Sequence, residues 1–128
     1  MMISEELRKY IDLVESEEAN GLLHEMANVG PQRHGIDNVY IFVGSVEDEP
    51  HWLRVKVSNI PGRYDRKNSF VIKMPSLDYD PKRVAKWITP NIMNKILSWI
   101  KLNQDVLYDY ETGKITDTDV FLNSLSKV

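Results

Sequence analysis

The 128-residue chain contains no cysteine and no apolar run long enough to cross a bilayer. The absence of cysteine excludes disulfides, thiolate nucleophiles and cysteine-ligated zinc, and it fits a reducing compartment. A membrane helix would need about 18 apolar residues in succession. The first residues are acidic where a secretory signal carries basic ones, and no apolar core follows them. We therefore expect a cytoplasmic protein without a membrane partner.

The common catalytic motifs are also missing from the sequence. The six glycines are scattered and form neither a G-x-G-x-x-G fingerprint nor a Walker loop. There is no G-x-S-x-G elbow, and the serines fall at predicted caps, turns or strand ends. We therefore assign no catalytic residue and no cofactor.

The composition is that of an ordinary globular domain, but the charges are unevenly placed. Lys and Arg number 16 against 19 Asp and Glu, and 42% of the residues are hydrophobic. Residues 5–25 hold seven acids and two bases, whereas residues 54–86 hold nine bases and three acids. This polarity suits self-association, an internal fit of the acidic part on the basic part, or an anionic partner.

Hydrophobic spacing predicts helices at both ends of the chain. Apolar residues recur at helical intervals from residue 3 onward and predict helical structure over 5–28. Near the other end, Thr89 can cap a helix that begins with Pro90 and stops at Gly113, giving about 21 helical residues. A final short helix capped by Thr118 completes the helical region 90–126.

The middle of the chain predicts a sheet. Residues 38–43, 51–57 and 70–74 are rich in β-branched and aromatic side chains, and 84–88 could be a fourth strand or part of a helix. The alternation in 51–57 predicts a half-exposed antiparallel strand. We expect one α+β domain over 1–128: helical 5–28, sheet 38–88 and helical 90–126. Its small antiparallel sheet of three to four strands should carry the long C-terminal helix on one face.

The hairpin connection 59–68 is the most distinctive surface feature. It combines cations that could contact phosphates with a ring on which a base could stack, namely Arg63, Tyr64, Arg66 and Lys67. These residues are the candidate nucleic-acid contacts. The alternative is a solvated loop whose cations pair with the acidic N-terminal helix.

Aromatic residues beside charges suggest a protein contact. Trp52 shares one face of its predicted strand with Arg54 and Lys56, and Trp99 is offset by one position from the apolar face of the long helix. Such residues are frequent anchors of interfaces. For Trp52 and Trp99 the core rim and an interface remain equally open, and all four are candidate partner contacts.

The three histidines could take part in metal or acid/base chemistry only if the fold brings them together. The spacing of His24, His34 and His51 matches no metal-ligand pattern, so we assign no metal site. The remaining enzymatic alternative places His51 beside Asp48 or Glu49.

Part of the chain resembles a known family. Pro50, His51 and Trp52 open a predicted strand, and a helix with Trp99 and spaced leucines closes the chain. This order resembles a family of small bacterial proteins of unknown function that often accompany toxin-antitoxin genes. In that family a Pro-Pro-His-aromatic-His stretch opens the strand, whereas here Glu49 and Leu53 replace its first proline and second histidine. The resemblance covers about half of the chain and implies a small bacterial accessory or regulatory protein.

Together these features predict a non-enzymatic protein-interaction or regulatory module of the bacterial cytoplasm, with a protein partner or self-association. The alternative is a nucleic-acid-associated regulator that uses residues 59–68. A second alternative is a metal-dependent or acid/base enzyme near His51.

Overall fold

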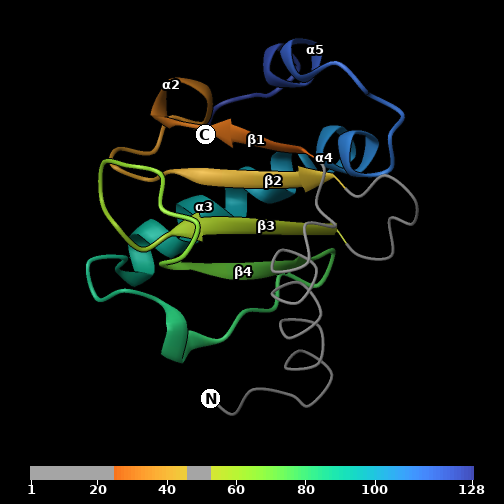
Figure 1. Cartoon of the computed structure of the whole chain (residues 1–128). Helices are drawn as coiled ribbons and strands as arrows, with labels where there is room; N and C mark the ends of the chain where they lie inside the picture. Colours follow the sequence, from red (N-terminus) through yellow and green to blue (C-terminus); the bar gives the residue numbers. More distant parts are fainter. Residues whose placement is uncertain (1–24, 46–52) are drawn as a thin grey trace.

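The computed structural model describes residues 25–45 and 53–128. Their order in the chain is β1 (Glu25–Val29), α2 (Pro31–His34), β2 (Ile41–Ser45), β3 (Leu53–Ser58), β4 (Ser69–Met74), the 3-10 helix η1 (Pro81–Arg83), α3 (Pro90–Leu102), α4 (Gln104–Glu111) and α5 (Thr118–Asn123). The four strands form an antiparallel sheet in sequence order, and the expected α+β class is confirmed (Figure 1).

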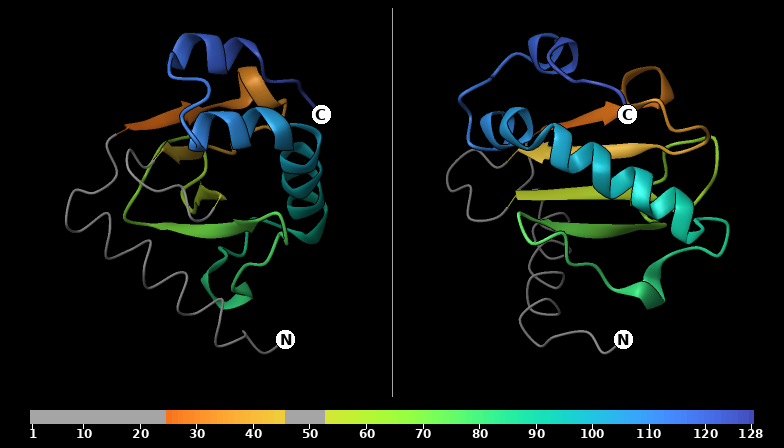
Figure 2. Two further views of the ribbon diagram at one scale, coloured as in Figure 1. Left: turned by 90° about the vertical axis from the view of Figure 1, so that its right-hand side faces the viewer. Right: turned by 180° about the vertical axis from the view of Figure 1, so that it is seen from behind.

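One face of the sheet and the C-terminal helices enclose the core. The strand register aligns buried apolar residues in rows across the four strands, such as Ala27, Val43, Val55 and Ile72. Helix α3 crosses the strands on this face, as the view from behind shows (Figure 2). Its inner side contributes Ile96, Trp99 and Ile100 to the same apolar cluster. We call this side of the sheet the helix face and the other side the open face.

The open face, which α3 does not cover, carries both charged and apolar side chains, and these side chains are buried. The register aligns Phe42, Lys56 and Val71 across three strands and places Arg54 opposite Lys73. Arg54 is 5% and Lys56 6% exposed, so the prediction of a half-exposed strand is wrong for these two side chains. Neither side chain is without an interaction partner.

The predicted helical region 5–28 is wrong at its end, and the rest of it lies outside the described residues. Glu25–Val29 forms strand β1 and pairs with β2. The apolar spacing up to Met26 suggested a helix, but Ala27 and Val29 are buried at every second position, the period of a strand. The first described element is therefore an edge strand.

Residues 84–88 are neither a strand nor an α-helix. They follow η1 as irregular chain and are fixed by Asn59, whose side chain accepts a hydrogen bond from Ala85 N at 2.9 Å. The side-chain amide of Asn59 also donates to Arg83 O. The backbone carbonyl of Asn59 accepts from Trp87 Nε1 at 2.7 Å. The sheet does have four strands, but the strand that joins the three predicted ones is β1 and not residues 84–88. No strand was predicted at the position of β1.

The predicted long C-terminal helix is two helices. Thr89 caps α3 as expected, because its side chain accepts from Ile92 N, and Pro90 is the first helical residue. Helix α3 ends at Leu102, and Asn103 is its C-terminal capping residue. The buried side-chain amide of Asn103 donates to Trp99 O and to Ser126 O. The break therefore depends on a contact with the distant C-terminal residues.

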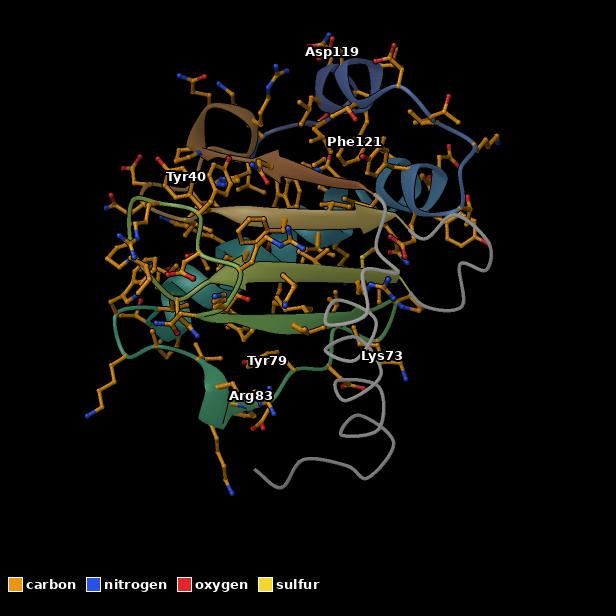
Figure 3. All side chains as sticks on the ribbon, in the orientation of Figure 1. Tyr40, Lys73, Tyr79, Arg83, Asp119 and Phe121 are labelled. Carbon is orange, nitrogen blue, oxygen red and sulfur yellow. The ribbon has the colours of Figure 1, made fainter. Side chains whose placement is uncertain are left out.

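The last helix begins at Thr118, which the sequence pattern predicted to lie outside the helix as its cap. Asp117 accepts hydrogen bonds from Asp119 N and Val120 N, so it replaces Thr118 as the capping residue. The rings of Tyr110 and Phe121 stack with their centroids 4.1 Å apart and join α4 to α5, where Phe121 is labelled in Figure 3.

Candidate functional site

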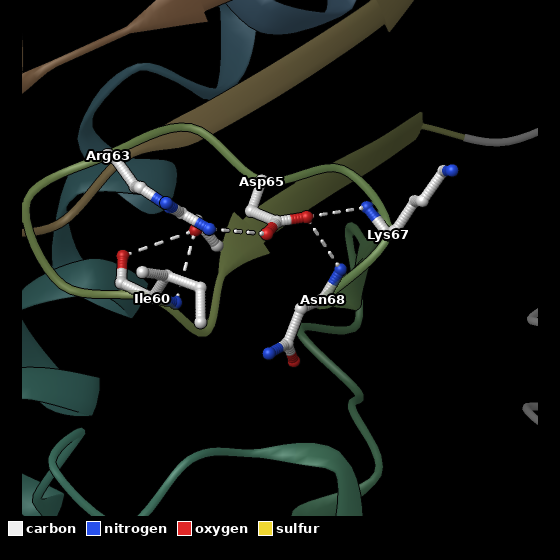
Figure 4. A network of polar contacts seen from close by, with 6 residues as sticks. Ile60, Arg63, Asp65, Lys67 and Asn68 are labelled. Atoms are coloured by element: carbon white, nitrogen blue, oxygen red, sulfur yellow. Dashed lines mark hydrogen bonds and ion pairs between the residues drawn. The ribbon is translucent and has the colours of Figure 1, made fainter.

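The hairpin connection 59–68, which we call the basic loop, is organised by Asp65. One oxygen of the Asp65 carboxylate accepts from the backbone N–H groups of Lys67 and Asn68, both at 3.1 Å. Its other oxygen pairs with the Arg63 guanidinium at 3.3 Å (Figure 4). Hydrogen bonds to the ionised form, first that from Asn68, lower the pKa of Asp65 below its usual value. The loop is therefore shaped around an ionised carboxylate.

Backbone hydrogen bonds fasten the basic loop to the chain before β2. Gly62 N in the loop donates to Asn38 O at 3.0 Å, and just before the loop Ser58 N at the end of β3 donates to Tyr40 O at 2.9 Å. Asn38 and Gly62 both have positive φ, of 64° and 78°, which favours Asn and Gly at such turns. These contacts fold the loop back over the open face of the sheet.

Tyr64 lies where the basic loop meets the sheet. Its ring packs edge-on against Tyr40, with centroids 4.6 Å apart, and 5.4 Å from the ring of Phe42. Partial burial raises the pKa of Tyr64, so its phenol is neutral at neutral pH. With 36% of its surface exposed, the ring keeps a side available to a ligand.

A cavity of about 500 Å³ opens beside the two tyrosines, and we call it the tyrosine pocket. Its lining consists of Asn28, Gly30, Pro31, Gln32, Arg33, Tyr40 and Tyr64. These residues come from the end of β1, from α2, from the chain before β2 and from the basic loop. Among the described residues, the lining contains two aromatic rings, two amides and one guanidinium, and none of these residues has a carboxylate. Such a pocket suits a neutral or anionic ligand with hydrogen-bonding groups.

Arg33 is held in place by a neutral partner. Its guanidinium donates to Asn123 Oδ1 at 2.9 Å, which links α2 to α5. No carboxylate among the described residues pairs with Arg33. The guanidinium can therefore attract an anionic group at the pocket.

The structure exposes all four residues that the sequence proposed for nucleic acid. Arg63, Tyr64, Arg66 and Lys67 are at the surface, and Arg63 is the one that pairs with Asp65. Sequence patterns did not reveal that Tyr40 and Arg33 would join Tyr64, because no spacing rule connects the predicted strand 38–43 or the polar stretch around Arg33 with the hairpin connection.

Three of the four candidate protein contacts are buried, and the fourth lies outside the described residues. Trp99 has no exposed area and lies in the core with its ring near His34, so an exposed Trp99 is ruled out. Arg54 and Lys56 are buried on the open face, and Trp52 lies outside the described residues.

His34 is a structural residue within the described part of the chain. It is fully buried, its Nδ1 accepts from Ile36 N at 2.9 Å, and its Nε2 is 2.9 Å from Val39 O. Burial lowers the pKa of His34, because the protonated ring would lose its hydration. His24 and His51, with Asp48 and Glu49, lie outside the described residues.

A second cavity of about 310 Å³ lies between η1 and the start of α3. Its lining is mainly apolar and includes Val84, Ile88 and Met93. Its polar side chains are those of Tyr79, Lys86 and Asn94.

Within residues 25–45 and 53–128, no cluster of three or more His, Cys, Asp or Glu side chains could hold a metal ion. No helix in these ranges is long and apolar enough to cross a membrane.

Comparisons of the chain with protein-family models, curated proteins and solved structures find no match.

Proposed function

We propose that the protein is a non-enzymatic binding module whose partner is single-stranded nucleic acid, bound at the basic loop and the tyrosine pocket. The observation that supports this proposal is that one loop carries both the exposed Arg66 and Lys67 and Tyr64, whose ring packs on Tyr40. Proteins that bind single strands combine cations that follow the phosphates with rings on which bases stack. Both kinds of group occur here in the basic loop.

The shape of the site favours a single strand over a duplex. The rings of Tyr40 and Tyr64 pack against each other beside a cavity and do not lie along a projecting helix. A paired base has both of its faces stacked within the duplex, so it cannot stack on such rings. An unpaired base has a free face.

A protein partner or self-association, which the sequence favoured, has less support from the described residues. The contacts proposed for it are buried in the cases of Trp99, Arg54 and Lys56. The family resemblance includes Pro50, His51 and Trp52, which lie outside the described residues. A bacterial accessory or regulatory role stays compatible with nucleic-acid binding.

The proposal is tested by fluorescence anisotropy with a labelled single strand of about ten nucleotides over a range of salt concentrations. We expect the logarithm of the affinity to fall linearly with the logarithm of the salt concentration. Each phosphate contact in a single strand contributes about 0.7 to that slope. The double variant Arg66→Ala/Lys67→Ala should therefore reduce the slope by about 1.4.

The matched control removes two other exposed cations, in Lys95→Ala/Lys101→Ala. Both residues lie on α3, which covers the helix face of the sheet, whereas the basic loop folds over the open face. The control should retain the wild-type slope. Binding that ignores salt, or an equal loss in both double variants, would contradict the proposal. A different pair of results would favour the protein-partner alternative. In that case this protein shows no affinity for the single strand, and it retains a stoichiometric protein from host lysate after nuclease treatment.

A further inference from the structure

We infer that the tyrosine pocket takes one unstacked nucleobase, while the cations of the basic loop contact the phosphates outside it. This inference rests on the proposed function and adds which part of the strand the pocket receives. A strand held by its phosphates alone would need no cavity beside Tyr64. The pocket of about 500 Å³ lies within the size range of small-molecule sites, about 300–1,000 Å³.

The groups in the lining match those of a base. Tyr40 and Tyr64 offer apolar ring surface, and both are within one pocket although they come from segments more than twenty residues apart. The amides of Asn28 and Gln32 provide both donors and acceptors, as the edges of bases do. Both amide residues are exposed at the rim, so a ligand can reach them.

The charge of the lining selects against other ring-binding ligands. Aromatic sites for quaternary ammonium groups depend on attraction between the cation and the ring. Here the Arg33 guanidinium would repel such a ligand, and the described part of the lining holds no Asp or Glu to offset it. A neutral base attached to an anionic backbone meets no such repulsion.

Gly30 leaves the space between the two tyrosines and α2 open. A Cβ atom on this residue would lie 3.1 Å from the Tyr64 hydroxyl and 3.6 Å from the Tyr40 ring. The backbone of Gly30 has φ −101°, a conformation open to any residue, so no turn requires glycine here. A side chain at this position would therefore fill the pocket without removing a charge.

The test compares an ordinary single strand with a strand of the same length in which every base is missing. The two probes have equal charge, so the ratio of their dissociation constants measures the base alone. Because stacking on one aromatic ring is worth about 1–3 kcal/mol per base, wild type should prefer the ordinary strand about 5- to 150-fold. Gly30→Val and Tyr40→Ala should bring this ratio close to one, and Tyr40→Phe should keep it.

Tyr108→Ala is the control, because Tyr108 is a tyrosine on α4 with 53% of its surface exposed, and it should keep the full ratio. Thermal melting of each variant separates loss of the pocket from loss of the fold, and Gly30→Val retains both tyrosines while its Cβ crowds the Tyr64 hydroxyl. If wild type binds both strands equally and with salt dependence, the nucleobase inference is wrong, and the proposed function stands for the basic loop alone. If neither strand binds, both are wrong. A ratio that survives in Gly30→Val and Tyr40→Ala would also overturn the inference.

Discussion

Protonation of His34 should destabilise the fold, because this ring is buried and its Nδ1 accepts a hydrogen bond that only an unprotonated nitrogen can accept. Nδ1 accepts a hydrogen bond from Ile36 N, so Nε2 must carry the hydrogen that it donates to Val39 O. A second proton on Nδ1 would face the Ile36 N–H directly and lose that hydrogen bond. The ring would also carry a charge in contact with Trp99 in the core.

The magnitude follows from the lowered pKa of His34. In the unfolded chain the ring has a pKa of about 6.5, and in the folded protein burial holds the pKa below that value. As the pH falls below about 6.5, His34 becomes protonated in the unfolded state but stays neutral in the folded state. The free energy of unfolding therefore decreases. The decrease is at most about 1.4 kcal/mol per pH unit, down to the folded pKa, against a typical total stability of about 5–15 kcal/mol.

Urea unfolding followed by tryptophan fluorescence at several pH values from about 7.5 to about 5.5 measures this effect. The reference is His34→Gln, whose amide can accept from Ile36 N and donate to Val39 O but cannot become charged. Other titrating groups, including His24 and His51, are common to both proteins, so the difference between the two curves reports His34. We expect wild type to lose stability more steeply toward acid. Parallel curves would refute the reasoning.

Three further substitutions test the fold and the loop. Asn103→Ala removes the amide that binds Ser126 and Trp99 O, and it should cost about 1–3 kcal/mol in urea unfolding because the buried Trp99 carbonyl and the part-buried groups of Ser126 lose a partner. Thr89→Ala removes the cap on Ile92 N and should cost about 1 kcal/mol, seen as a lower melting temperature. Asp65→Ala removes the acceptor that shapes the basic loop, so affinity for a single strand should fall in anisotropy while the melting temperature stays within a few degrees of wild type. Unchanged affinity in Asp65→Ala would mean that the loop shape is irrelevant to binding.

The parts of the fold predicted correctly depend on neighbours in sequence. The start of α3 follows from Thr89 and Pro90, and strands β2, β3 and β4 follow from runs of β-branched and aromatic residues. Local hydrogen bonds and side-chain shape suffice for such elements.

The errors occur where distant residues decide the structure. The break after α3 depends on the hydrogen bonds of Asn103 with Ser126, 23 positions away. Burial of Arg54 and Lys56 likewise could not be read from the alternation of their strand, because period two gives the face and not what covers it.

The candidate site was half predictable for the same reason. The cations and the ring of the basic loop stand together in sequence, so Tyr64 and Lys67 could be proposed. The pocket needs Gly30, Arg33 and Tyr40, which reach Tyr64 only because the loop is fastened to the chain before β2. No spacing rule connects these segments.

The most direct test of the central claim is a titration of ¹⁵N-labelled protein with the single strand, followed by amide chemical shifts. Binding at the proposed site predicts that the largest shifts occur at Gly30, Tyr40, Tyr64 and Lys67, while the amides of Lys95 and Lys101 on α3 stay in place. Saturable shifts concentrated on α3, or no shifts at any strand concentration, would contradict the claim that the basic loop and the tyrosine pocket form the binding site.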